Sequence, residues 1–297
     1  MMESLQKIGR YCLETQWLYV LIIVVVTPFI GAFLTSFDRK LSARMQGRIG
    51  PSWFQPLYDV AKLFSKKPMA LHRPQLIYAT LHLVFMVVAV VLLALGCDLL
   101  MVLFVQAFSM ICLVLGGMSV RSPYSWIGSQ RKIMQMLGVE PVFLVMIVAL
   151  YLRNKSFLGS ALISSSDTTP LLLTMPLMFL AFLCAIAIEM EKSPFDLASS
   201  HHAHQEIVKG VTLEYSGPFL GVIEIAHFYE ITFFFGLMMA FWHTNIIIGL
   251  LVAFAGLIFL SVLDNSFARL TPNWMLRFMW TVPLSMALAN LIWIWVK

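Results

Sequence analysis

The chain has 297 residues, of which 60% are hydrophobic and 12% are charged, and its formal net charge is +5. Soluble globular domains carry about 25% charged residues, so this composition excludes an ordinary soluble enzyme or binding domain. The basic residues are spread over several loops and form no single basic domain, which argues against nucleic acid as a partner.

Apolar runs of about 20 residues recur along the chain, and runs of this length predict helices that span a bilayer. The sequence therefore predicts an all-α polytopic membrane protein, a single membrane domain with eight transmembrane helices. An even number of spans places both termini on one side of the lipid bilayer. The predicted spans are 17–37, 75–97, 99–119, 137–153, 170–190, 218–242, 246–264 and 275–296.

Four loops on one side of the predicted bundle hold most of the 20 lysine and arginine residues. Lysine and arginine are enriched in short cytoplasmic loops, so this side is predicted to be cytoplasmic and both termini are predicted to be extracytoplasmic. The multi-pass chain is thus expected in the cell membrane. The four loops are 38–74, 120–136, 190–217 and 265–274.

The first of these loops contains the stretch PLYDVAKLFSKK, which has the pattern of an amphipathic helix. Its apolar residues recur at the i, i+3, i+4, i+7 spacing of one helical face, and its charged residues lie on the opposite face. Such a helix lies along the membrane interface, either as a simple anchor or as a docking surface for a soluble partner. The apolar residues are Leu57, Val60, Ala61 and Phe64, and the charged residues are Asp59, Lys62 and Lys66.

Titratable residues lie in or beside several of the predicted spans, where an ionised group costs roughly 2.5 kcal/mol or more. Glu224, His227 and Glu230 follow one another at three-residue spacing in the sixth span, so they share a helical face. Glu230 lies near the middle of that span. A buried cluster that only fixes helix packing is one interpretation, and an ion path is favoured over it because several such groups occur together. The other acids are Glu140 at the start of the fourth span and Glu189 and Glu191 at the end of the fifth.

The stretch SSHHAHQE in the third loop places three histidines beside one acid. Histidine titrates near neutral pH, and further ligands at metal-site spacing are missing, so a proton-accessible loop is favoured over a metal site. The four cysteines form no C-x-x-C pair, so no metal or redox centre is predicted in this chain. His82, in the second span, is interpreted as a buried packing residue. The residues of the stretch are His201, His202, His204 and Glu206.

Three stretches in the predicted cytoplasmic loops resemble the quinone-module membrane protein of respiratory complex I, known as its H subunit. They are ARMQGRIGP at 43–51, PFDL at 194–197 and EYSG at 214–217. Other stretches are more similar to a sister branch, the homologous membrane subunit of energy-converting, Ech-type (group 4) membrane-bound [NiFe] hydrogenases. These are GVEP at 138–141, IEMEKSPFDL, AHQEIVKG and DNSFARL, which begins at Asp264. The resemblance covers nearly the whole chain.

The resemblance implies a prokaryotic membrane anchor that couples ferredoxin-dependent H2 evolution to H+ or Na+ pumping. The partners it implies are the large and small hydrogenase subunits, a ferredoxin-like Fe–S subunit and an antiporter-like membrane subunit. The [NiFe] centre and [4Fe-4S] clusters are expected in those partners, with none in this chain. By position in the motifs, the family's functional acids correspond to Glu140, Glu189, Asp196, Glu206 and Glu214. Residues expected to face the soluble arm are Arg39, Arg44, Arg48, Asp59, Lys62, His201, His202 and His204.

Three other functions compete with this one. A complex I subunit with a quinone site is disfavoured by the shortened first loop and by DNSFARL. A passive anchor would hold the soluble arm and conduct no ions. A stand-alone secondary transporter is ranked last, because such folds often contain inverted repeats and no convincing repeat is present.

Overall fold

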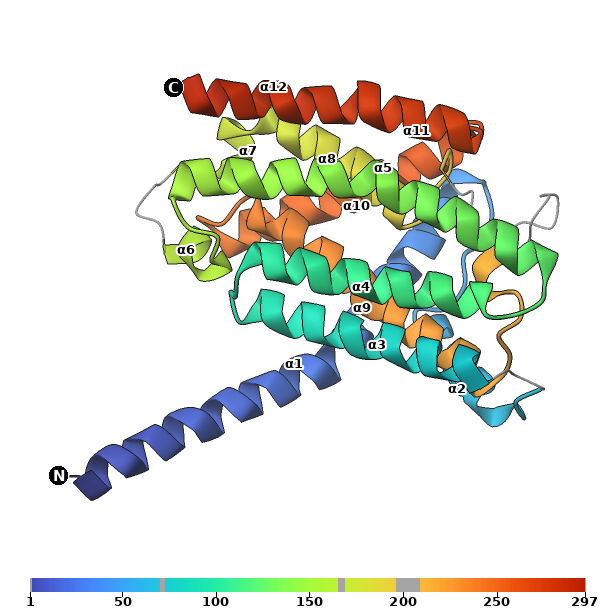
Figure 1. Cartoon of the computed structure of the whole chain (residues 1–297), viewed down its shortest axis with the longest axis horizontal. Coiled ribbons are helices and arrows are strands. Elements are labelled where there is room, and N and C mark those ends of the chain that lie inside the picture. Colours follow the sequence, from blue (N-terminus) through green and yellow to red (C-terminus); the bar gives the residue numbers. More distant parts are fainter. Residues whose placement is uncertain (1, 70–72, 165–168, 196–208, 297) are drawn as a thin grey trace.

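The computed structural model describes residues 2–69, 73–164, 169–195 and 209–296, with side chains from Trp17 onward apart from those of 162–164. Within these ranges the chain is built from helices and has no strand, which confirms the all-α membrane class (Figure 1). The long spans are α1 (Met2–Met45), α3 (Arg73–Ala94), α4 (Leu99–Met118), α5 (Pro123–Asn154), α9 (Pro218–Ala240), α10 (Ile246–Ser266) and the pair α11 (Pro272–Thr281) and α12 (Pro283–Val296). The shorter elements are α2 (Gln55–Ser65), α6 (Gly159–Ser164), α7 (Leu171–Thr174), α8 (Pro176–Glu189) and the 3-10 helix η1 (Gly210–Thr212).

Seven helical segments in the described chain are long and apolar enough to cross a membrane, and α8 supplies the eighth predicted crossing as a shorter apolar helix. The predicted span 170–190 is broken at Met175, so α8 has only 14 residues and is about 21 Å long. Nine of the 14 α8 residues are buried, most of them from Ala181 onward, and the helix contacts α5, α10 and α12, whereas Leu177 and Leu180 near its start are exposed. Because protein covers most of α8 from Ala181 onward, this part of the helix need not match the thickness of the bilayer.

The predicted loop 120–136 is wrong, because α5 already begins at Pro123. Its first half was missed because it carries polar residues that lower its hydropathy. These side chains lie on one face of the helix and are buried inside the bundle. They are Ser125, Ser129, Lys132 and Gln135. Polar residues that face protein are compatible with a membrane helix, but they lower its mean hydropathy, so a search for apolar runs does not detect the helix.

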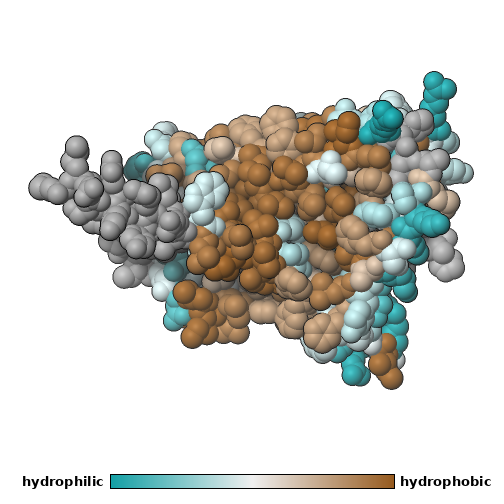
Figure 2. All heavy atoms as spheres, turned by 90° about the horizontal axis from the view of Figure 1, so that it is seen from below, coloured by the Kyte–Doolittle hydropathy of each residue, from teal (hydrophilic) through white to brown (hydrophobic). Residues whose placement is uncertain are grey.

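Both chain ends lie at the same end of the bundle, as expected for an even number of crossings (Figure 1). We call this the terminal end. We call the opposite end the loop end, and it carries α2, η1 and the segment between α4 and α5. Figure 2 shows a broad apolar band across one face, with hydrophilic residues gathered mainly at the right-hand side of the view. The assignment of the loop end to the cytoplasm remains a prediction.

The predicted amphipathic helix is confirmed as α2. It contacts α1 and α9 at the loop end. Leu63 and Phe64 pack against Gly221 of α9, where a built Cβ atom would lie 3.4 Å and 3.1 Å from them. Tyr58 remains exposed. The helix therefore covers the start of α9 with one face and leaves another uncovered.

Gly31 allows α1 and α9 to approach each other closely, and it provides a first prediction. A Cβ atom at Gly31 would lie 2.1 Å from the carbonyl oxygen of Phe228. Gly31→Ala is therefore expected to push the helices apart and to lower the free energy of unfolding by about 1–3 kcal/mol, the usual range for overpacking. The matched control is Gly236→Ala, whose Cβ meets only Leu93 Cδ2, at 3.6 Å.

The measurement is thermal unfolding of both purified variants in the same detergent. Gly236→Ala should unfold at or above the wild-type temperature, because alanine favours a helix by about 1 kcal/mol over glycine. If the two variants unfolded at the same temperature, the close approach of α1 and α9 would not matter for stability.

Candidate functional site

A cavity of about 480 Å³ enters the bundle from the loop end and reaches the titratable side chains of the membrane domain. Its outer wall includes the exposed Arg48, and its deepest walls include the buried Glu189 and Glu230. Residues of α1, α3, α4, α5, α8, α9 and α10 line it. Because helices far apart in sequence contribute to one wall, the site exists only once the bundle has assembled. We call it the polar cavity.

The polar stripe of α9 runs along this cavity. Glu224, His227 and Glu230 all line it, and Glu230 is buried at 5% exposure. Its Oε2 atom is 3.1 Å from Nδ1 of His227, and its buried Oε1 atom has no partner among the described residues. An unpaired carboxylate oxygen at the middle of a membrane helix is available to water, to a proton or to a cation.

Glu189 lies across the cavity from this stripe, at the end of α8. Its side chain is 4% exposed, and its Oε1 atom accepts a hydrogen bond of 3.1 Å from Nε2 of Gln106 on α4. The other carboxylate oxygen, Oε2, is buried and has no partner in the described part of the chain. The cavity thus holds two buried acids, each with one oxygen available, as a hydrated ion or proton path requires.

Lys132 supplies the positive charge between these acids and was not predicted. It is 2% exposed, its Nζ atom lies 3.2 Å from Oε1 of Glu191, and it donates a hydrogen bond of 3.2 Å to the carbonyl oxygen of Glu189. Hydropathy alone placed it in a loop. The signal that could have found it is the three- and four-residue spacing of small and polar residues from Ser125 through Lys132 to Gln135.

His82 was interpreted as a packing residue. It is buried, and its Nδ1 atom lies 2.8 Å from the hydroxyl and 2.9 Å from the carbonyl oxygen of Ser109 on α4, which satisfies that nitrogen. It also lines the polar cavity. The histidine therefore both joins α3 to α4 and borders the titratable groups.

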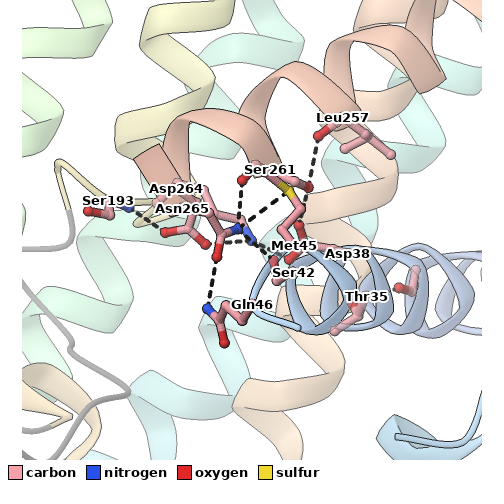
Figure 3. A network of polar contacts seen from close by, with 12 residues as sticks. Thr35, Asp38, Ser42, Met45, Gln46, Ser193, Leu257, Ser261, Asp264 and Asn265 are labelled. Carbon is pink, nitrogen blue, oxygen red and sulfur yellow. Dashed lines mark hydrogen bonds and ion pairs between the residues drawn. The ribbon is translucent and has the colours of Figure 1, made fainter. Parts of the chain in front are cut away.

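The segment after α8 is held by a second charged network near the mouth of the cavity. Lys192 pairs with Asp38 of α1 and lies 3.8 Å from Asp264 of α10. Ser261 donates to Asp38 at 2.6 Å, and the backbone N–H of Ser193 donates to Asp264 at 2.9 Å. Figure 3 shows these side chains of α1 and α10 pointing toward one another. Glu191 and Lys192 thus tie one short segment to α5 on one side and to α1 and α10 on the other.

Lys192→Met is expected to lower the free energy of unfolding by about 1–3 kcal/mol, because partly buried hydrogen bonds to charged groups are lost. The measurement is thermal unfolding of the purified protein. Arg39→Gln is the control, because the Arg39–Asp59 pair is 3.1 Å long but both side chains are about 40% exposed. Exposed pairs contribute at most about 1 kcal/mol, so an equal effect of both changes would contradict a structural role for Lys192.

The structure sorts the remaining predicted residues. Glu140 is half-buried on α5 and is not among the residues that line the polar cavity. Glu214, Arg44 and Lys62 are exposed, and Asp59 pairs with Arg39. The cavity brings together Arg39, Arg48, Glu189, Glu191, Glu224, His227, Glu230 and Asp264. Asp196, His201, His202, His204 and Glu206 lie outside the described residues.

The EYSG stretch follows η1 at the loop end. Its tyrosine, Tyr215, is buried against Gly116 of α4, and burial raises the pKa of Tyr215, so its hydroxyl stays protonated at neutral pH. Its neighbour Glu214 faces outward. The stretch therefore presents its acid away from the bundle and anchors itself by the tyrosine.

Metal binding has no support in the described part of the chain. No group of three or more histidine, cysteine or acidic side chains there is arranged to hold a metal ion. The histidine stretch of the third loop lies outside that part, so the prediction about it stays a prediction.

Comparison with known proteins places the chain in a family. The family described as NADH dehydrogenase matches residues 18–295. The H subunit of NADH-quinone oxidoreductase from Bacillus thuringiensis (strain Al Hakam) is 28% identical, over 92% of this chain and 91% of the relative. The corresponding protein of Bacillus cereus (strain AH187) has the same values.

The fold is also that of a solved structure. A chain of the membrane-bound sulfane sulfur reductase (MBS), an archaeal respiratory membrane complex, superposes with a TM-score of 0.86. The likeness covers 94% of this chain and 99% of that one at 22% identity. The predicted homology to the H subunit of complex I is thereby confirmed, and the chain belongs to the NADH dehydrogenase family as a multi-pass membrane subunit of a complex I-related respiratory oxidoreductase.

Proposed function

We propose that this chain anchors the soluble arm of a ferredoxin-dependent, H2-evolving energy-converting [NiFe] hydrogenase and couples its electron transfer to H+ or Na+ pumping. The observation that carries the coupling role is the polar cavity. It joins exposed residues at the loop end to Glu189 and Glu230 within the bundle. A passive anchor has no need of two buried acids that each keep an oxygen unpaired.

The segment after α8 offers a way to transmit a change from the arm. Glu191 contacts Lys132, and Lys192 contacts Asp38 and lies near Asp264. A shift of this segment would move the charge next to Glu189 and alter its affinity for a proton or cation. Two arrangements of the segment, favoured by oxidised and reduced states of the arm, would be sufficient to bias ion entry.

The hydrogenase assignment is supported by the resemblance of GVEP, AHQEIVKG and DNSFARL to that branch. The stretch DNSFARL has a clear structural role, because Asp264 accepts from the backbone N–H of Ser193, and Asn265 bonds Ser42 of α1 and Gln46, which follows α1. This stretch therefore shapes the mouth of the cavity, where a branch-specific partner would bind. The expected partners are the hydrogenase subunits, a ferredoxin-like Fe–S subunit and an antiporter-like membrane subunit, with the metal centres in those partners and the loop end in the cytoplasm.

A second candidate is a quinone-site subunit, and the names of the Bacillus relatives favour it. The cavity volume of about 480 Å³ lies within the range of about 300–1,000 Å³ that is usual for small-molecule sites. The charged lining of the cavity suits ions and water better than an isoprenoid chain.

The deciding experiment is purification of the intact complex through a tag on this chain. Nickel, iron and H2 evolution from reduced ferredoxin are the expected results. Flavin without nickel, together with quinone reduction, would overturn the hydrogenase assignment in favour of the second candidate.

A further inference from the structure

A second cavity, also of about 480 Å³, lies in the half of the bundle nearest the terminal end. It is bordered by the N-terminal part of the α1 span and by the C-terminal parts of α5 and α9. Its walls are almost entirely apolar and include Phe143 and Met146, which are each only 4% exposed. We call it the apolar cavity.

The apolar cavity is continuous with the outer surface of the membrane domain. Ile22, Val26 and Ile30 of α1 line it, and each of them is more than 40% exposed. Figure 1 shows α1 running away from the other helices toward its N-terminus. A protein interior is normally packed with few voids, so a space of this size beside the hydrocarbon of a bilayer will be filled by a hydrocarbon chain.

Polar atoms occur at the end of this cavity, just beyond the C-terminus of α9. Trp242 and His243 line it. The indole Nε1 atom and both imidazole nitrogens are buried and have no hydrogen-bond partner among the described residues. Buried polar groups normally have partners, so the indole N–H and the imidazole N–H, which are both donors, indicate a ligand with oxygen acceptors at this point.

The order of apolar and polar groups identifies the ligand. The apolar walls of the cavity lie within the span of the helices, at the depth of acyl chains. The polar atoms of Trp242 and His243 lie at a helix end, at the depth of head groups, where tryptophan is enriched in membrane proteins. We infer that the apolar cavity binds one acyl chain of a membrane phospholipid, with ester or phosphate oxygens of that lipid beside Trp242 and His243. This inference does not depend on the proposed function.

The test uses the intact complex in nanodiscs that contain phosphatidylcholine with a photoactivatable diazirine on one acyl chain. After irradiation, labelled peptides are identified by mass spectrometry. Label on Phe143 or Met146 is expected, because these buried side chains can be reached only by a chain inside the cavity. Absence of label there, with label present on the exposed Val262 of α10, would overturn the inference and point to a neighbouring protein subunit as the occupant.

Two variants make the test specific. Gly236→Leu adds a side chain into the cavity, where a Cβ atom has only an ordinary contact with Leu93. It is expected to lower the label on Met146 severalfold, whereas Val262→Leu, on the exposed face of α10, should leave it unchanged. Trp242→Phe keeps an aromatic side chain but removes the indole N–H donor, and it should also reduce the label on Met146.

Competition by unlabelled molecules decides the chemical class of the occupant. It also tests the inference if Gly236→Leu does not fold. Excess unlabelled phosphatidylcholine is expected to displace the probe from wild-type protein. Displacement by an isoprenoid quinone at far lower amounts than by phospholipid would overturn the assignment to a lipid. Equal labelling of Met146 in wild type and in a folded Gly236→Leu variant would overturn the site itself.

Discussion

Replacing Lys132 by methionine is expected to be among the most destabilising single changes in the chain. The lysine is 2% exposed, and its removal leaves the carboxylate of Glu191 without its buried partner and the carbonyl oxygen of Glu189 without its donor. Breaking a buried ion pair by removing one partner lowers the free energy of unfolding by about 3–5 kcal/mol. The measurement is thermal unfolding of the purified protein, together with the yield of assembled complex.

The double variant Lys132→Met/Glu191→Gln separates a charge effect from a packing effect. Because the second change also removes the negative charge that Lys132 neutralises, the double variant should be more stable than Lys132→Met alone, which is the signature of direct coupling in a double-mutant cycle. Lys62→Met, on the exposed face of α2, is the control and should unfold like wild type. If Lys132→Met and Glu191→Gln had additive effects on the free energy of unfolding, the ion pair between these residues would be contradicted.

The second large effect is expected from Glu189→Gln on ion translocation. Glutamine preserves the size of the side chain but cannot bind or release a proton. The carboxylate faces the polar cavity and keeps Oε2 available, so its loss should reduce the number of ions pumped per electron severalfold or more. Pumping by reconstituted complex in liposomes and electron transfer by the same preparation are the paired measurements.

Glu214→Gln is the matched control for this prediction. The resemblance predicts a functional role for both acids, but Glu214 is exposed and is not part of the cavity wall. Glu214→Gln should therefore retain pumping. If Glu189→Gln pumped normally while electron transfer was unchanged, the chain would be a passive anchor and the coupling role would be wrong.

A third comparison concerns the two oxygens of the α9 acid. The Oε2 atom of Glu230 is hydrogen-bonded to Nδ1 of His227, and its Oε1 atom has no partner in the described structure. In a Glu230→Gln variant, the amide group supplies one donor and one acceptor at these two positions. Such a variant should fold, and it can be examined alongside Glu189→Gln in the same pumping assay. His227→Gln reports whether the partner of Oε2 is needed.

Local sequence patterns were sufficient for much of the fold. Runs near 20 apolar residues located the long spans, and the i, i+3, i+4, i+7 spacing located α2. The three-residue spacing of Glu224, His227 and Glu230 placed them on one face of α9, and the structure confirms that all three line one cavity. These features are determined within one helix, so the period of the helix is enough to reveal them.

Other features depend on partners that are distant in sequence. The loop predicted at 120–136 is helical because its polar residues face the bundle interior, and hydropathy cannot distinguish an inward polar face from a loop. The break at Met175 is tolerated because Met175 itself is fully buried inside the protein. Asp38, which no sequence pattern marked, becomes important only because Lys192 of another segment meets it.

The sequence by itself thus determined the membrane class, the number of crossings, the family resemblance and the acids of α9. Only the tertiary structure decided that Lys132 is the buried cation between the acids, that Glu214 lies outside the cavity and that Gln106 supports Glu189. The physical reason is that the energy of an ionised group in a membrane depends on what surrounds it in three dimensions, and those neighbours come from helices far apart in the chain.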